Sequence, residues 1–191
     1  MLVGTLLIAL LGAAPPAPPT EVSGAFVYHV QDDGGRRDFV SLLPPARMGR
    51  AGLPGPALLG VLRKRLDEGG ELESGNFVPN AVAVDYLQSF IARTAPTLEE
   101  AQSAARAAQA RGDRWLNYID GRTRARADAA DEDRIGTFDV VDGAIHAEGW
   151  RPNRAYRLVS DAGILTLDAR LHARYVDALA ALSAGATSDA R

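Results

Sequence analysis

Two aromatic and two arginine side chains gather in one short segment, WRPNRAY, between two predicted pairs of strands. Aromatic faces pack on apolar groups, and planar guanidinium groups bind carboxylate or phosphate. If the tryptophan instead closes the core at the end of a strand, its role is structural. The candidate binding residues are therefore Trp150, Arg151, Arg154 and Tyr156, and their chemistry suits an anionic glycan or an acidic protein surface.

Three histidines are the only imidazoles: His29, His146 and His172. None is spaced as H-x-x-x-H, so no pair is predicted to share a metal ion. Ser74, on a polar loop, is the serine best placed for a nucleophile, but the G-x-S-x-G elbow is absent. We predict no catalytic residue from sequence, although a histidine, a carboxylate and a serine can still assemble in the folded chain.

An acidic run follows part of the calcium-loop pattern, with Asp131, Asp133 and Gly136 at positions one, three and six. Ile135 occupies an oxygen-ligand position, and Asp142 stands where a bidentate glutamate is needed. A solvated acidic loop that leads into a strand explains the run better. The sequence also has no cysteine, phosphate loop or dinucleotide fingerprint, so no metal or cofactor is predicted.

Basic residues at 122, 124 and 126 precede acidic residues at 128 and 131–133. Such a pairing of blocks is typical of a solvated, self-compensating surface, and a polyanion contact is the alternative. The net charge is −3, with both signs mixed along the chain. We therefore expect no nucleic-acid partner.

The first 14 residues form an apolar, signal-peptide-like segment, and a proline-rich linker follows at 15–20. The run from Leu2 to Ala14, about 13 residues, is shorter than the ~20 that span a bilayer, so no permanent membrane span is expected. It lacks an arginine or lysine at its start. A misassigned start codon, an uncleaved segment, or a buried N-terminal strand or helix are the alternatives.

The elements that position these residues follow from periodicity, turns and caps. We predict a hairpin of strands at 22–30 and 37–43, a short helix from Pro56 to Leu66, and a loop at 69–79. Asn80 caps a second helix to Arg93, and a capping box at Thr97 and Glu100 starts a third, with a buried alanine face. A strand at 115–119 and two hairpins follow, at 135–150 and 155–167.

Asp168 caps a last helix, in which Leu171, Tyr175, Leu179 and Leu182 share one face. The expected fold is α+β, a single domain over 21–185 with mainly antiparallel hairpins and about four helices, the last one C-terminal. Residues 186–191 are a frayed tail.

The sequence favours an exported bacterial protein, periplasmic or secreted, that binds a protein or glycan partner without catalysis. One alternative is an envelope hydrolase that uses carboxylate and histidine side chains, and a histidine beside a carboxylate in a cleft would favour it. Another is a cytoplasmic accessory protein with a mispredicted N-terminus. Neither the ligand nor the oligomeric state follows from the sequence.

Overall fold

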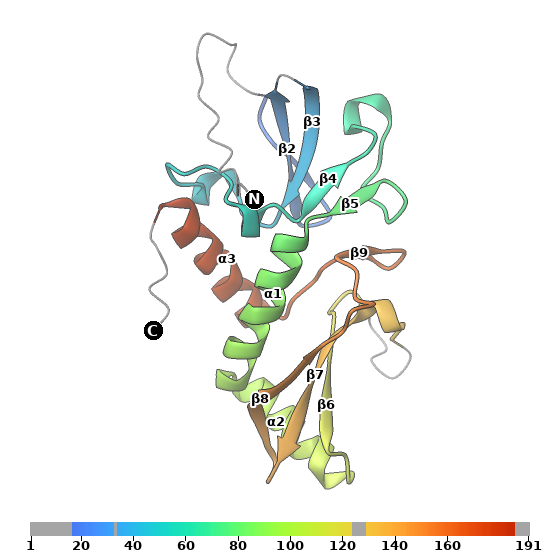
Figure 1. The fold of residues 1–191 in the computed structure, drawn as a ribbon, viewed down its shortest axis with the longest axis vertical. Coiled ribbons are helices and arrows are strands. Elements are labelled where there is room, and N and C mark those ends of the chain that lie inside the picture. The colour runs from blue at the N-terminus through green and yellow to red at the C-terminus, as the bar shows by residue number, and fades with distance from the viewer. Residues whose placement is uncertain (1–16, 33, 124–128, 186–191) are drawn as a thin grey trace. The chain divides into compact units, whose positions relative to one another are not determined.

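The computed structural model describes residues 17–32, 34–123 and 129–185, so the segment at 1–14 and the tail at 186–191 lie outside the described residues. The chain forms two compact units, Met1–Val84 with Ala173–Arg191, and Asp85–His172. It passes between them within helices α1 (Ala81–Thr94) and α3 (Ala169–Ser183) (Figure 1). The expected single domain over 21–185 stays a prediction.

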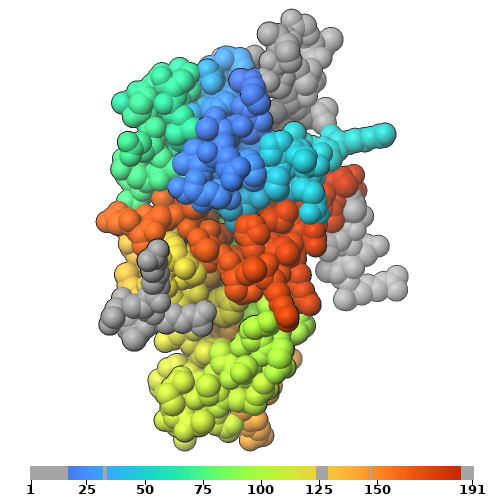
Figure 2. Space-filling model, turned by 180° about the vertical axis from the view of Figure 1, so that it is seen from behind, coloured from blue at the N-terminus to red at the C-terminus, as the bar shows by residue number. Residues whose placement is uncertain are grey.

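The described part of the first unit is built on a five-stranded sheet in which every strand is antiparallel to its neighbours. Its strands follow the chain order: β1 (Thr20–Val22), β2 (Ala25–Asp32), β3 (Gly35–Ser41), β4 (Gly60–Leu62) and β5 (Phe77–Pro79). Figure 2 shows the segments of the first strands, in blue, side by side at the surface of this unit. Its buried side chains include Val27, Val40, Leu43, Leu59, Tyr175 and Leu179.

The predicted helix from Pro56 to Leu66 is wrong, because this segment contains β4 between two short 3₁₀ turns. A Cβ on Gly60 would lie 2.3 Å from the Val78 carbonyl oxygen and 2.4 Å from the Phe77 ring, so β5 packs directly on its backbone. The leucine spacing of four residues fits a helix, but pairing with β3 and β5 outweighs that local preference. The predicted loop at 69–79 accordingly ends in β5.

The α+β class is confirmed, with three α-helices in the described residues where about four were expected. Asn80 caps α1 by accepting the Val82 N–H at 3.1 Å, and Asp168 caps α3 by accepting the Leu171 N–H at 2.9 Å. The predicted capping box at Thr97 and Glu100 is wrong. Thr97 belongs to a 3₁₀ turn at Ala95–Thr97, and its hydroxyl donates to the Thr94 carbonyl, so α2 (Glu99–Ala110) begins after Leu98 without a side-chain cap.

The second unit carries an antiparallel three-stranded sheet, β6 (Trp115–Ile119), β7 (Arg134–Val141) and β8 (Ala144–Pro152), in the described residues. Asp142 and Gly143 turn β7 into β8 with φ values of 51° and 74°, the left-handed conformations of a tight hairpin. Helix α2 packs on one face of this sheet (Figure 1) through its buried Ala101, Ala105 and Ala108. A two-stranded hairpin, β9 (Val159–Ser160) and β10 (Gly163–Ile164), follows.

Within the described ranges, no helix has both the length and the apolar composition that crossing a membrane requires.

Candidate functional site

The structure separates the four predicted binding residues. Trp150 is half-buried, and its ring centroid lies 4.4 Å from that of Phe138 on the face of the sheet that α2 covers. Arg151, the next residue on β8, is exposed on the opposite face, where its Nη2 lies 2.5 Å from Asp139 Oδ1. Successive side chains of a strand point to opposite faces, so these two neighbours cannot share one surface.

Tyr156 and Arg154 lie on the loop between β8 and β9. Tyr156 is 7% exposed, and its hydroxyl donates a 2.8 Å hydrogen bond to Asp120 Oδ2. Arg154 is exposed. Trp150 and Tyr156 therefore pack into the unit with most of their surface, whereas Arg151 and Arg154 present their guanidinium groups to solvent. The binding role of the four residues stays a prediction.

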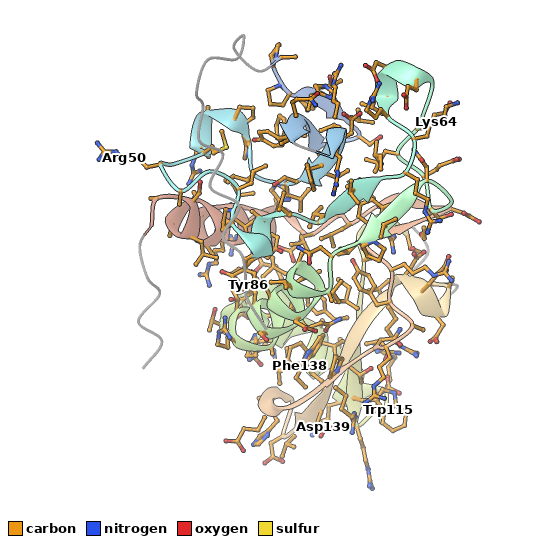
Figure 3. All side chains as sticks on the ribbon, turned by 45° about the horizontal axis from the view of Figure 1, so that its top comes forward. Arg50, Lys64, Tyr86, Trp115, Phe138 and Asp139 are labelled. Carbon is orange, nitrogen blue, oxygen red and sulfur yellow. The ribbon has the colours of Figure 1, made fainter. Side chains whose placement is uncertain are left out.

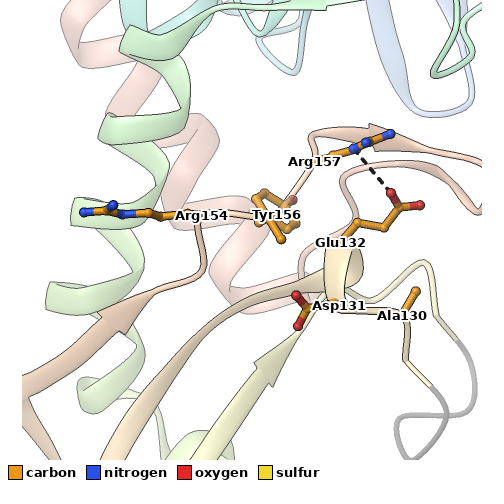
Figure 4. Close-up of a pocket in the computed structure, with 7 residues that line it drawn as sticks. Ala130, Asp131, Glu132, Arg154, Tyr156 and Arg157 are labelled. Carbon is orange, nitrogen blue, oxygen red and sulfur yellow. Dashed lines mark ion pairs between the residues drawn. The ribbon is translucent and has the colours of Figure 1, made fainter.

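A shallow, open pocket lies where residues 130–132 meet residues 154–157, and its volume is about 540 Å³ (Figure 4). Two carboxylates and two guanidinium groups line it, from Asp131, Glu132, Arg154 and Arg157. Arg157 Nε lies 3.3 Å from Glu132 Oε2, and Asp131 pairs with Arg134. Among the described residues, Arg154 has no carboxylate partner, so within this part of the chain its charge is the surplus one at the pocket.

A buried ionic network lies beneath this pocket and holds its wall. The side chain of Arg122 is 2% exposed and donates from Nε to Asp133 Oδ1 at 2.9 Å. Its Nη atoms donate to backbone carbonyls of the pocket segments, to Arg157 at 2.6 Å and Glu132 at 3.3 Å. The interpretation of this basic block as solvated is wrong for Arg122, while residues 124–126 lie outside the described residues.

The two carboxylates of the network have pKa values shifted in opposite directions. Burial raises the pKa of Asp120, although the charge of Arg122 and the Thr166 N–H act against it. Burial also acts to raise the pKa of Asp133, but hydrogen bonds from Thr123 and Ser160, with the charge of Arg122, outweigh it and lower that pKa. Each carboxylate has several donors, so the network is built to be rigid.

The face of the β6–β7–β8 sheet opposite α2, here called the open face, carries an exposed tryptophan among polar groups. Trp115 is 53% exposed and stands opposite Asp139 in the register, while Asn117 stands opposite Thr137. The Thr137 hydroxyl donates to Asn117 Oδ1 at 3.0 Å. Figure 3 labels Trp115, Phe138 and Asp139 on this sheet.

The sequence does not single out the open face, although the alternation of residues in β6 points to it. In WLNYI the tryptophan and asparagine alternate with leucine and tyrosine, which places Trp115 and Asn117 on one face of β6. The pattern does not indicate which face of the sheet α2 covers. A tryptophan on a strand is more often buried than exposed, so the sequence offers no reason to choose this residue.

A hydroxyl, an imidazole and a carboxylate line up in the first unit. Thr20 Oγ1 lies 3.1 Å from His29 Nε2, and His29 Nδ1 lies 2.7 Å from Asp38 Oδ1. A carboxylate only accepts hydrogen bonds, so Nδ1 carries the proton and Nε2 of the neutral ring is free to accept from Thr20. Asp38 is fully buried, and its Oδ2 accepts the Leu66 N–H at 2.8 Å.

The acidic side chains at 131–142 do not point toward a common site. Asp131 pairs with Arg134, Asp133 is buried against Arg122, and Asp139 faces Arg151 on the open face. Among the described residues, no group of three or more histidine, aspartate or glutamate side chains is arranged to hold a metal ion.

Comparisons of this chain with known protein families, curated proteins and solved structures find no match.

Proposed function

We propose that the protein is exported to the periplasm or secreted, and that it binds an anionic partner, a glycan or an acidic protein surface, without catalysis. The binding site is the pocket at residues 130–132 and 154–157. The observation that carries the proposal is the surplus guanidinium of Arg154 at the rim of this pocket. The apolar segment at 1–14 supports export.

The charges around the pocket favour an anion. The acidic groups of Asp131 and Glu132 are each matched by a basic group, from Arg134 and Arg157. A carboxylate or phosphate that enters the pocket would meet Arg154 without first breaking an existing ion pair. It would also gain a planar donor, which binds such groups with two parallel hydrogen bonds.

The buried network supports this function by reducing the cost of binding. Arg122 donates to the carbonyls of both Glu132 and Arg157, so its hydrogen bonds hold the two segments that line the pocket in position without a ligand. A wall held in this way loses little conformational entropy on binding.

Binding of immobilised polygalacturonate and poly-L-glutamate by the full chain tests the proposal, with one probe for each kind of partner. Arg154→Ala should weaken capture of at least one probe severalfold, and wild-type capture should weaken with added salt, because ions screen exposed charges over ~8 Å. Arg50→Ala, which removes another exposed arginine, is the matched control. If the wild type captures neither probe, or if the two variants behave alike, the pocket is not the binding site.

Export needs its own measurement. The native protein should appear in the periplasmic or extracellular fraction, with an intact mass that lacks the first residues of the sequence. Recovery from the cytosol with Met1 retained would contradict export and support the cytoplasmic alternative.

The alternative function, an ester or amide hydrolase, is favoured by one observation, the alignment of Thr20, His29 and Asp38. In this function His29 Nε2 takes the proton of the Thr20 hydroxyl as its oxygen attacks an acyl carbon. The imidazolium then gives that proton to the leaving group, while Asp38 holds the ring and balances its charge. Water hydrolyses the acyl-threonine in the second half of the reaction.

A fluorophosphonate probe and p-nitrophenyl acetate separate this function from a structural role. The hydrolase function predicts labelling at Thr20 and an ester hydrolysis rate that falls by about 10²–10⁴ in both Thr20→Ala and His29→Gln. Thr97→Ala, at another exposed threonine, is the control. Absence of labelling in the folded wild type would mean that Thr20, His29 and Asp38 have a structural role, in which their hydrogen bonds connect strands β1, β2 and β3 with the Leu66 backbone.

A further inference from the structure

The open face of the β6–β7–β8 sheet carries an aromatic surface that the anion pocket does not use. Trp115 is 53% exposed, and Val141, further along β7, is also 53% exposed. Leu116, Phe138 and Ile145 point to the other face, toward α2, so the core does not need Trp115 for its packing. A half-exposed indole ring can stack on the flat apolar face of a ligand.

Polar side chains surround Trp115 in two rows across the strands. The register puts Trp115, Asp139 and His146 in the first row. It puts Asn117, Thr137 and Arg151 in the second row, two residues along on β6 and β7 but five along on β8, where the register shifts between Thr137 and Asp139. Paired residues of an antiparallel sheet project from the same face, so all six belong to one surface. On β6 and β7 the two rows lie about 6.8 Å apart, the distance between alternate residues of a strand.

The charges on this surface favour a neutral ligand. Arg151 Nη2 and Asp139 Oδ1 lie 2.5 Å apart, so the cation and the anion of the surface neutralise each other. An anionic polymer would have to compete with Asp139 for Arg151. A neutral ligand with many hydroxyl groups would instead hydrogen-bond to the pair as it stands, and to the amide of Asn117 and the hydroxyl of Thr137.

We propose that the open face binds a neutral saccharide, with one sugar ring stacked on Trp115. A pyranose has an apolar face of C–H groups, which suits the flat indole, and a rim of hydroxyl groups, which suits the surrounding amide, hydroxyl, carboxylate and guanidinium. A single-stranded nucleic acid also stacks on aromatic rings, but it needs free cations for its phosphates, and Arg151 is already paired. This inference stands independently of the anion pocket.

Affinity electrophoresis of the full chain in gels containing hydroxyethyl cellulose, xylan or glycol chitin tests the proposal, with polygalacturonate and a single-stranded oligonucleotide as further probes. At least one neutral polysaccharide should retard the wild type, and salt should have little effect. Trp115→Ala should weaken this binding about tenfold, since it removes the stacked ring. Asn117→Ala should weaken it less.

Two controls keep the result specific. Val82→Ala removes another exposed apolar side chain, which is 51% exposed, and should bind like the wild type. Arg154→Ala should also bind like the wild type, so failure of the anion pocket and failure of the open face remain distinguishable. Absence of retardation by all neutral polysaccharides, or full retention by Trp115→Ala, would overturn the proposal. So would oligonucleotide binding that Trp115→Ala abolishes while the polysaccharides bind to no variant.

Discussion

Removing one buried hydroxyl should show how much the ionic network contributes to the second unit. Tyr156→Phe keeps the ring that lies beneath Arg122, at 5.6 Å from the guanidinium carbon, and deletes the 2.8 Å hydrogen bond to Asp120 Oδ2. A buried hydrogen bond to a charged group contributes about 1.5–3 kcal/mol. The free energy of unfolding should fall by about this amount, because Arg122 Nε, at 3.6 Å from Oδ2, is too far away to replace the lost hydrogen bond.

Tyr118→Phe is the matched control, because it also removes a tyrosine hydroxyl that donates to an aspartate, here Asp168 at 3.0 Å. This bond is exposed to water, so its loss should cost less than about 1 kcal/mol. Urea denaturation followed by circular dichroism measures both variants. Equal losses, or a loss below about 0.5 kcal/mol for Tyr156→Phe, would refute the view that the network stabilises this unit.

The loss of stability in Tyr156→Phe should also depend on pH. The Tyr156 hydroxyl stabilises the ionised form of Asp120 and acts to lower its pKa, against the larger effect of burial. The cost of Tyr156→Phe should therefore shrink as the pH falls and Asp120 takes up a proton. A cost that does not change on acidification would mean that the carboxylate is not the partner that matters.

Three further outcomes are expected. Leu179→Ala should cost about 2–5 kcal/mol because the leucine is fully buried, whereas Arg174→Ala, at an exposed position of the same helix, should cost much less. Gly136→Ala should cost about 1–3 kcal/mol and change the fluorescence of Trp150, because the added Cβ would lie 2.4 Å from that ring. Asp133→Asn should be less stable than the wild type at neutral pH. The lowered pKa of Asp133 stabilises the fold above its ordinary value of 3.8, so the difference should narrow as the pH falls below that value.

Local signals determined much of the fold. Asn80 and Asp168 start their helices as expected, because a side-chain acceptor next to a free backbone N–H acts over only a few residues. The turn at Asp142 and Gly143 is equally local, since both residues tolerate positive φ. The alanine face of α2 also follows from its sequence.

Long-range contacts determine the features that local signals do not predict, such as the strand at Gly60 and the burial of Arg122. Gly60 belongs to a strand because β3 and β5 pair with its segment, although the leucine spacing around it favours a helix. The position of Arg122 in a buried network depends on carbonyls up to 41 residues away, at Gly163. A run of charged residues in the sequence carries no information about such partners.

At the candidate sites, too, the sequence determines some features and the tertiary structure determines others. The sequence identifies the types of side chain near residue 150, and strand alternation already separates Trp150 from Arg151. Only the tertiary structure decides that α2 covers the face of Trp150 and leaves that of Trp115 open, and that Asp38 lies opposite His29. The physical reason is that a side chain's chemistry belongs to its residue, whereas its exposure and its partners belong to the elements packed around it.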